Sequence, residues 1–502
     1  MKLNKSLVTC AVAMALSSTT VLASSKDLSE SVHTKNKVQV VGNSMVINQT
    51  SGTGVTWGND LRALQDGDLH QLEITTTGEA NSTETVQVGQ SNLLLLTTTG
   101  NENSQVYTQN GEMNGALTEL TGNGNEIAVT QSGAGFLGAN NEAINVITGD
   151  NNEITVEQSD GGHWAYNKDM QGNSNAVSVS QAGAWSEMHL DKVQGDANSI
   201  DVVQDGLWNT LKVNELIGDA NELNVEQVGD IQVATIGLIN GSDNDISIDQ
   251  QGGSNAVTVA AVEGNDNTLM LDQRGDDNEI VSDVFTGSDN EVAINQQGDE
   301  NKASADVIGS DNDFKVTQLG NSNESYMGAL GDNNDFTLIQ LGNDNSSHIA
   351  NFNAADSNVT VSQAGDSNTS LIQSSYPDVS LTSFNNEVMV SQMGNENEST
   401  VTFSSILDSN NSNVDIAQNG DLNSLDMMIE GSGHNIDIAQ TGNYNMIGGL
   451  GGDALLVGGG DITLSINQMG DGNLVEGSII SASGNISITQ VGDYNSATIV
   501  QQ

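Results

Sequence analysis

Apolar and polar residues alternate along this chain in short segments that recur at a nearly constant interval. In most segments an Asn or a substitute is followed, at steps of two, by two apolar residues and a Gln, and a Gly stands two residues after the Gln, as in residues 267–275 (NTLMLDQRG) and 290–298 (NEVAINQQG). Alternation with a period of two is typical of a β-strand with one buried face. Each segment therefore predicts a strand of roughly seven residues whose Asn, apolar and Gln side chains share one face.

The Gln of this pattern recurs twenty times in one phase. From Gln158 to Gln363 every interval is 22 or 23 residues, and a Gly follows in eighteen units, with Ser51 and Asp160 as the exceptions. Self-similarity at such a period indicates a repeat architecture, in which each unit buries its apolar face against its neighbours. The Gln positions are Gln49, Gln65, Gln87, Gln109, Gln131, Gln158, Gln181, Gln204, Gln227, Gln250, Gln273, Gln296, Gln318, Gln340, Gln363, Gln392, Gln418, Gln440, Gln468 and Gln490.

A second, weaker strand follows each first strand after a Gly-x-x-Asn turn. Residues 301–307 (NKASADV) keep the step of two but end in an apolar residue in place of Gln, and the same turn, as in GSDN at 309–312, leads to the next unit. Gly and Asn accept the backbone conformations that tight turns need. We therefore predict an all-β fold: a β-solenoid of about twenty stacked two-strand coils with parallel in-register sheets, in which coils are about 4.8 Å apart.

Asn and Gln occupy inward positions of the predicted first strands, where a polar group costs free energy unless it is hydrogen-bonded. Stacking places each amide one strand spacing from its equivalent, so that it can donate to the oxygen of the next amide, as in cross-β structures. Glu215 also falls at a nominally inward position, which this pattern does not explain. The residues that we expect to form the structural ladder are Asn244, Gln250, Asn267, Gln273, Asn290, Gln296, Asn312, Gln318, Asn334 and Gln340.

Four intervals exceed 23 residues, and we interpret their extra residues as insertions in turns. The single Pro, Pro377, falls in one of them, where it removes no ladder hydrogen bond. The interval from Gln49 to Gln65 is short, which predicts that one strand is abbreviated or missing there. The long intervals are Gln131 to Gln158, Gln363 to Gln392, Gln392 to Gln418, and Gln440 to Gln468.

The charge of the chain narrows the choice of partners. Its 502 residues carry 12 Lys+Arg against 66 Asp+Glu, a formal net charge of −54. Nucleic acids and anionic membrane surfaces require basic patches, so we expect neither as a partner. Many acids lie in the turns, where stacking forms columns of like charge that favour solubility. Weak divalent-cation binding along these columns is the alternative.

Residues 1–23 have the pattern of a secretory signal peptide. Lys2 and Lys5 precede the apolar stretch 7–16, and small residues close the segment. The only cysteine, Cys10, lies inside it, so the exported chain would contain no disulfide.

The remainder divides into two predicted parts. Residues 24–42 form an N-terminal segment, and residues 43–502 form the repeat solenoid. Every later apolar stretch is too short for a transmembrane helix, so we expect no membrane insertion.

The unit N-x5-Q-x-G-x-x-N resembles the curlin repeat of the curli subunits, which are secreted bacterial functional amyloids of the biofilm matrix. The resemblance extends over residues 43–502 and implies a solenoid that polymerises into extracellular fibres at the bacterial surface. The partners that it implies are further copies of the chain, a curli nucleator subunit, a secretion pore and chaperones. The chain departs from the familiar subunits in having more repeats, in mostly lacking Gln on the second strand, and in residues 24–37, which are not Gly-rich.

Other chemistry has little support in the sequence. The motifs HExxH, CxxC and GxSxG are absent, and the carboxylates are spread over all coils. His70 and His163 stand where Asn is expected at the start of a second strand, and His434 at the start of a first strand, so we interpret them as turn substitutions. We expect no enzymatic activity, no catalytic or metal site and no cofactor.

Residues 495–501 repeat the strand pattern with its Gln restored. We expect the strand edge formed by Asn495, Ala497, Ile499 and Gln501 to recruit another chain. The leading hypothesis is a structural subunit of extracellular curli-like amyloid fibres that support biofilm matrix, adhesion and aggregation, assembled by templated end-to-end stacking. The alternatives are a monomeric secreted β-solenoid adhesin or ligand-binding surface, modulated by calcium, and then an enzyme of the β-helix type.

Overall fold

The chain folds into two compact units of β-structure, the first ending at Trp185 and the second beginning at Ser186. Each unit is a parallel β-solenoid, and the two together contain about 19 turns, which confirms the predicted fold class. Neither the predicted signal peptide 1–23 nor Cys10 lies among the described residues. The computed structural model describes residues 32–34, 42–51, 58–134, 140–283, 285–374, 381, 383–404, 406–460, 462–481 and 484–501.

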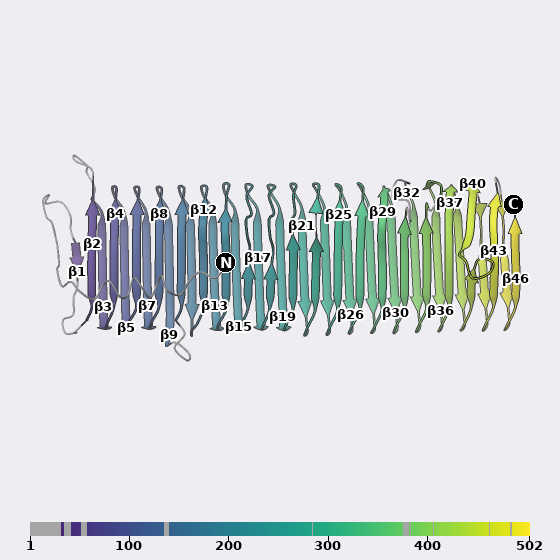
Figure 1. Ribbon diagram of the computed structural model, residues 1–502, viewed down its shortest axis with the longest axis horizontal. Coiled ribbons are helices and arrows are strands. Elements are labelled where there is room, and N and C mark those ends of the chain that lie inside the picture. Colours follow the sequence, from purple (N-terminus) through teal and green to yellow (C-terminus); the bar gives the residue numbers. More distant parts are fainter. Residues whose placement is uncertain are drawn as a thin grey trace. The chain divides into compact units, whose positions relative to one another are not determined.

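Each coil contributes one strand to each of two sheets, and the arrowheads in Figure 1 alternate accordingly. We call the sheet that contains the Gln series the first-strand sheet and the other the second-strand sheet. In the first unit the first-strand sheet contains β1 (Val32–Thr34), β3 (Asp60–Asp68), β5 (Ser82–Gln90), β7 (Ser104–Glu112), β9 (Glu126–Ala134), β11 (Glu153–Ser159) and β13 (Ala176–Ala184). Its second-strand sheet contains β2 (Ser44–Thr50), β4 (Gln71–Thr77), β6 (Leu93–Thr99), β8 (Gly115–Thr121), β10 (Glu142–Thr148) and β12 (Trp164–Gln171).

The second unit repeats this arrangement over more coils. Its first-strand sheet contains β15 (Ser199–Leu207), β17 (Glu222–Asp230), β19 (Asp245–Gly253), β21 (Thr268–Arg274), β24 (Glu291–Gln297), β26 (Asp313–Leu319), β28 (Asp335–Leu341), β30 (Asn358–Ala364), β33 (Glu387–Met393), β36 (Asn413–Asn419), β38 (Asn435–Thr441), β41 (Ile462–Thr463), β42 (Ile466–Met469), β44 (Gly484–Asn485) and β45 (Ile488–Val491). The opposite strands are β14 (Glu187–Val193), β16 (Thr210–Lys212), β18 (Val233–Thr235), β20 (Ala256–Ala260), β22 (Glu279–Asp283), β23 (Phe285–Thr286), β25 (Lys302–Ile308), β27 (Glu324–Leu330), β29 (Ser346–Ala355), β31 (Thr369–Ser374), β32 (Ser383–Phe384), β34 (Glu398–Phe403), β35 (Ser409–Asn410), β37 (Ser424–Ser432), β39 (Met446–Gly448), β40 (Leu455–Gly460), β43 (Leu474–Ser481) and β46 (Ser496–Gln501).

Strands pair in parallel with their equivalents one coil away, and equivalent residues are register partners. Leu269 pairs with Ile246 on one side and Val292 on the other, and all three side chains are buried. Phe314 and Phe336 stack in the same way, with ring centroids 4.9 Å apart. The core of each coil is therefore a thin layer in which like side chains lie above one another.

Gln49 is an exception to the predicted series. Its strand β2 pairs with β4, so Gln49 is the register partner of Thr76 in the second-strand sheet, whereas Gln65 lies in β3 of the first-strand sheet. The short interval between Gln49 and Gln65 thus joins a second strand to the following first strand, and the Gln column begins at Gln65.

The coils of 23 residues carry their additional residue on the second-strand side. β25 and β27, in coils of 22 residues, pair without interruption, whereas the register between β27 and β29 shifts after Met327. Glu215 belongs to such an irregular segment: after the short strand β16, it has a φ of 91° and is exposed, while Leu216 is buried. The bulge therefore rotates Glu215 outward and explains its apparent inward position.

The described insertions lie between strands of the second-strand sheet, although the first strand after the last of them is divided into β41 and β42. One lies between β39 and β40 and another between β34 and β35, where the buried carboxylate of Glu430 accepts hydrogen bonds from the backbone N–H groups of Ile406 and Leu407 at 2.8 and 2.7 Å. Pro377 and residues 135–139 lie outside the described residues.

Stacking makes Gly necessary in the turns. Gly298 has a φ of +120°, and a Cβ atom added there would lie 2.1 Å from the carbonyl oxygen of Gly320 in the next coil. A second positive φ, 59°, falls on Glu300. Asn301, which we expected to adopt a turn conformation, instead begins the second strand with its amide buried. The sequence G-x-x-N thus requires Gly for close approach of the backbones as much as for its dihedral freedom.

We expect Gly298→Ala to destabilise its coil by about 2 kcal/mol, because both the dihedral and the contact with Gly320 are unfavourable for Ala. Hydrogen exchange measured by mass spectrometry should show faster exchange over β24 to β26. Gly460→Ala is the matched control, because a Cβ atom there would have no neighbour within 4 Å. Equal exchange in the two variants would contradict the stacking argument.

Candidate functional site: the amide columns

The predicted Gln residues form a continuous hydrogen-bonded column in the second unit. Gln250 donates from Nε2 to Oε1 of Gln273 at 2.9 Å, and the series continues through Gln296, Gln318 and Gln340 at 3.0, 2.9 and 2.9 Å. All five side chains are fully buried. Each amide oxygen is thereby satisfied by the preceding coil, and the desolvation cost of the buried amide is offset.

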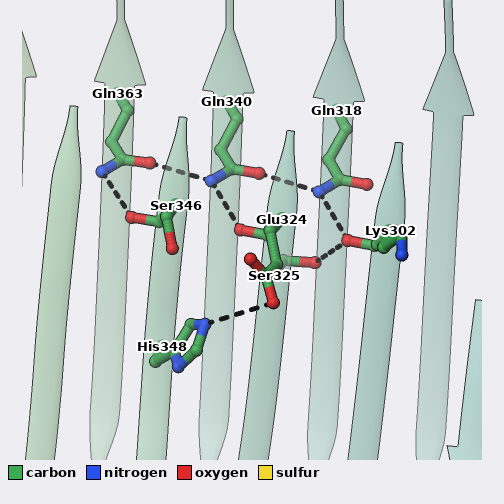
Figure 2. A network of polar contacts seen from close by, with 8 residues as sticks. All are labelled: Lys302, Gln318, Glu324, Ser325, Gln340, Ser346, His348 and Gln363. Carbon is green, nitrogen blue, oxygen red and sulfur yellow. Dashed lines mark hydrogen bonds and ion pairs between the residues drawn. The ribbon is translucent and has the colours of Figure 1, made fainter. Parts of the chain in front are cut away.

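The Gln amide also connects the two sheets. Nε2 of Gln318 donates to the carbonyl oxygen of Lys302 at 3.0 Å, and Nε2 of Gln340 donates to that of Glu324 at 3.0 Å, as Figure 2 shows. These carbonyls belong to the first residues of β25 and β27. Each Gln therefore uses one proton along the column and the other across the core, a cross-link that the strand pattern alone did not reveal.

The predicted Asn residues form a second column at the starts of the first strands. Oδ1 of Asn267 accepts from both the backbone N–H and Nδ2 of Asn290, at 3.1 and 3.0 Å, and Nδ2 of Asn290 also donates to the carbonyl oxygen of Gly309 at 3.0 Å. Each Asn thus bonds to the coils on both sides. The same bonds join the predicted residues Asn244, Asn267, Asn290, Asn312 and Asn334.

The Gln and Asn columns run in opposite directions. Gln273 donates to the Gln296 side chain, toward higher residue numbers, whereas Asn290 donates to the Asn267 side chain, toward lower ones. The two faces of any coil are therefore different: one offers a Gln donor and an Asn acceptor, and the other offers the reverse.

A third column lies at the starts of the second strands, outside the residues that we singled out from the sequence. Asn278 donates from Nδ2 to Oδ1 of Asn255 at 3.1 Å and to the carbonyl oxygen of Gly298 at 2.7 Å. The sequence does indicate this column, because both turns of each unit share the sequence G-x-x-N and therefore end in an Asn. The series continues through Asn301, Asn323 and Asn345.

Exposed turn residues form a further ladder. Asp276 donates its backbone N–H to Oδ1 of Asp299 at 3.0 Å, and the same bond links Asp299 to Asn321, Asn321 to Asn343, and Asn343 to Asp366 at 2.9, 3.0 and 2.9 Å. The first residue after the turn Gly must therefore supply an oxygen acceptor.

The other turn shows that this acceptor need not be charged. Ser242 donates its backbone N–H to Asn265 Oδ1 at 2.8 Å, and Asn265 donates to Ser288 Oγ at 3.1 Å. Within the described ranges, no group of three or more His, Cys, Asp or Glu side chains could hold a metal ion. The turn acids thus have a structural role as acceptors of hydrogen bonds from the preceding coil.

The three histidines singled out earlier are buried at the ends of strands. His70 and His163 replace Asn in the third column. The backbone N–H of His70 donates to Oδ1 of Asn43 at 2.9 Å, and that of His163 donates to Oδ1 of Asn141 at 3.2 Å. His434 lies with Nε2 2.9 Å from the carbonyl oxygen of Glu430. Burial lowers the pKa of His70 and of His163, so the neutral ring is favoured.

Three of the predicted edge residues, Ala497, Ile499 and Gln501, lie in β46, which pairs with β43, and Asn495 directly precedes this strand. Asn495 donates from Nδ2 to Oδ1 of Asn473 at 2.8 Å, and Ala497 and Ile499 are register partners of Val475 and Gly477. Their side chains and that of Gln501 are half-buried, whereas equivalent residues of interior coils are buried. The structure thus places three of the four residues on one strand and Asn495 at its start, with half-buried inward side chains that a further coil would cover.

Carboxylates also stack on the outer face of the first-strand sheet. Asp313 and Asp335 are register partners, and burial raises the pKa of Asp335, with the charge of Asp313 raising it further. Asp245 beside Glu222 shows the same effect, again with burial as the larger cause. At neutral pH these pairs therefore oppose the stacking that the amides favour.

We expect Gln296→Met to destabilise its coil by about 3 kcal/mol, because it removes three hydrogen bonds of about 1 kcal/mol each from buried partners. The partners are Gln273, Gln318 and the carbonyl oxygen of Glu279. Hydrogen exchange over β21 to β26 should accelerate. Gln297→Met provides the control at the adjacent, exposed position. If both variants behave like wild type, the column contributes nothing to stability.

Acidification should stabilise the stacked carboxylates. A raised pKa in the folded state means that the folded chain binds the proton more tightly, so this contribution is complete below the unfolded pKa and is lost as pH rises through the folded pKa. Amide exchange in β26 and β28, corrected for intrinsic rates, should therefore slow between about pH 7 and about pH 4. Asp335→Asn should weaken this dependence, whereas Asp289→Asn, in a turn, should preserve it. An identical pH profile for all three proteins would refute the assignment.

Comparison with known proteins places these columns in a recognised repeat. The family model of the curlin associated repeat matches five overlapping segments, at residues 218–252, 241–275, 264–296, 287–320 and 315–342. A search of curated proteins found no match to the chain. The matched segments contain the whole predicted ladder from Asn244 to Gln340. Curlin repeats in a β-solenoid are typical of curli-like structural or adhesive proteins. Residues 218–342 of the chain thus consist of curlin associated repeats.

Proposed function

We propose that this chain is a structural subunit of extracellular curli-like amyloid fibres that support biofilm matrix, adhesion and aggregation. The observation that carries the proposal is the continuity of the amide columns, in which each coil receives all its axial hydrogen bonds from coils like itself. A stack of this kind can be extended by any chain with the same columns. Copies of the chain are accordingly the principal partner, with a nucleator subunit, secretion pore and chaperones as further partners by family resemblance.

The opposite directions of the columns favour head-to-tail addition. Gln490 accepts from Gln468 at 3.0 Å and donates to the carbonyl oxygen of Leu474 at 3.1 Å. An incoming coil would offer a Gln oxygen to Gln490 and an Asn donor to Asn495. Two identical faces would instead oppose donor to donor. Unlike faces that join in this way generate an open filament in place of a closed dimer.

The proposal includes no enzymatic activity and no cofactor, because the recurrent polar groups are engaged in structural hydrogen bonds. It places the mature protein outside the cell, and the curlin associated repeats at residues 218–342 support this location. In the part of the chain that the structure describes, no helix is both long and apolar enough to cross a membrane.

Purified residues 24–502 should form fibres that bind thioflavin and give a cross-β reflection at about 4.8 Å. Assembly should accelerate with ionic strength, because salt screens the repulsion between these strongly acidic chains. Electron microscopy over time, with and without calcium, provides the direct measurement. A folded chain that stays monomeric in every condition would contradict the proposal and favour the adhesin.

Ile499→Pro should slow fibre elongation, because the backbone of Ile499 pairs with Gly477 of β43 and Pro there distorts β46, the strand that a further chain would pair with. Tyr494→Ser, in the exposed turn before β46, is the control from the same coil. Hydrogen exchange over β24 to β30 verifies that the remaining coils are folded. Elongation of the Pro variant at the wild-type rate would exclude this edge as the growth site.

A further inference from the structure

The outer face of the second-strand sheet carries a hollow of about 440 Å³ in the second unit. Its volume falls in the range of small-molecule sites. The side chains on which the argument rests come from four adjacent strands, β22, β25, β27 and β29. They are Glu279, Lys302, Ser304, Glu324, Tyr326 and His348.

Tyr326 is a fixed aromatic surface in this hollow. Its hydroxyl donates to Oδ2 of Asp306 at 2.9 Å, and a Cβ atom at Gly328 would lie 2.7 Å from that hydroxyl and 3.1 Å from the ring. The ring therefore lies against the backbone of Gly328, which only Gly permits. Burial, and then the Asp306 hydrogen bond and charge, raise the pKa of Tyr326 to about 12, so the hydroxyl remains a donor. The ring centroid lies 6.1 Å from that of His348, and the two rings are tilted by 58° to each other.

The first unit shows what a tyrosine on this kind of face attracts. Nζ of Lys168 lies 4.3 Å from the centroid of the Tyr166 ring, a cation–π contact within one strand. Lys168 stands two residues after Tyr166, and the corresponding position after Tyr326 is Gly328. The Tyr166 ring thus has the Lys168 ammonium group as a neighbour from its own strand, whereas the corresponding residue after Tyr326 has no side chain.

The charges around Tyr326 also favour a cation. Lys302 lies 3.6 Å from Glu279, and the His348 ring lies 4.0 Å from Glu324. Glu279 and Glu324 are the register partners of Lys302 on its two sides, so two carboxylates flank one ammonium group. Figure 2 shows Glu324 and His348 directed toward each other. Lys302 and Ser304 add hydrogen-bond donors to the carboxylate acceptors. Donors and acceptors together suit a ligand that has several hydroxyl groups beside its amine. The ammonium group of a lysine side chain in a peptide would use only the carboxylates.

We propose that this hollow binds an amino-sugar unit of a glycan. The ammonium group of the sugar lies near Tyr326 and Glu324, and its hydroxyls bond to Lys302, Ser304 and Glu279. Because the hollow lies on an outer sheet face, the site is independent of whether the chains polymerise, and its failure would leave the fibre proposal intact.

Titration of residues 24–502 with soluble oligosaccharides, followed by calorimetry, tests the site. We expect glucosamine oligomers to bind more tightly than N-acetylglucosamine or glucose oligomers, and a lysine-rich peptide to bind more weakly still. Tyr326→Ala should weaken glucosamine binding about five- to tenfold, as expected for loss of an aromatic cation contact. Tyr444→Ser, which removes an exposed turn tyrosine outside the hollow, should bind like wild type.

The double variant Glu279→Gln, Glu324→Gln should lose the preference for the amine-bearing oligomer, because it removes the acidic partners but keeps their shapes. Hydrogen exchange over β25 to β29 verifies that each variant is folded. Three results would overturn the proposal: no glycan binding by wild type up to about 10 mM, equal binding by Tyr326→Ala, or equal affinity for the amino and neutral sugars. Tighter binding of the lysine-rich peptide would assign the hollow to a different ligand class.

Discussion

The whole structure depends on hydrogen bonds between identical side-chain amides in successive coils. A shift of one residue between coils would turn the Gln296 side chain to the solvent face, and a shift of two would place it beside an apolar residue. Because either shift leaves buried amides unsatisfied, the columns hold the coils in one register. Register in turn brings the turn backbones so close that Gly298 has no room for a side chain.

Much of this arrangement could be predicted from the sequence, because the repeat imposes identical surroundings on identical residues. The period, the inward residues and the parallel stacking follow from residues such as Asn267, Leu269 and Gln273. The bond from Gln318 to the Lys302 carbonyl could not be predicted, since it depends on the distance between sheets. Gln49 was misplaced because its local sequence fits either strand and only pairing distinguishes them. Glu215 seemed anomalous because a bulge alters strand alternation without leaving a strong sequence signal.

The outward positions are free of the constraint that governs the interior. Acidic pairs such as Asp313 and Asp335 weaken the stack at neutral pH. Their presence indicates that the hydrogen bonds of the amide columns outweigh the repulsion between these carboxylates. Tyr166 and Tyr326 occupy such outward positions and have different polar neighbours. Chemistry specific to individual coils is therefore expected on the outer faces, where a substitution changes a surface without disturbing its neighbours above and below.

The opposed Gln and Asn columns have an electrical consequence. An amide group is a dipole, and in a helix aligned peptide dipoles add to a field that concentrates at the two ends. Here the Gln273 and Asn290 amides point in opposite senses, so their axial components partly cancel within each coil. A long array of coils therefore accumulates smaller terminal partial charges than a row of amides that all point in one direction would.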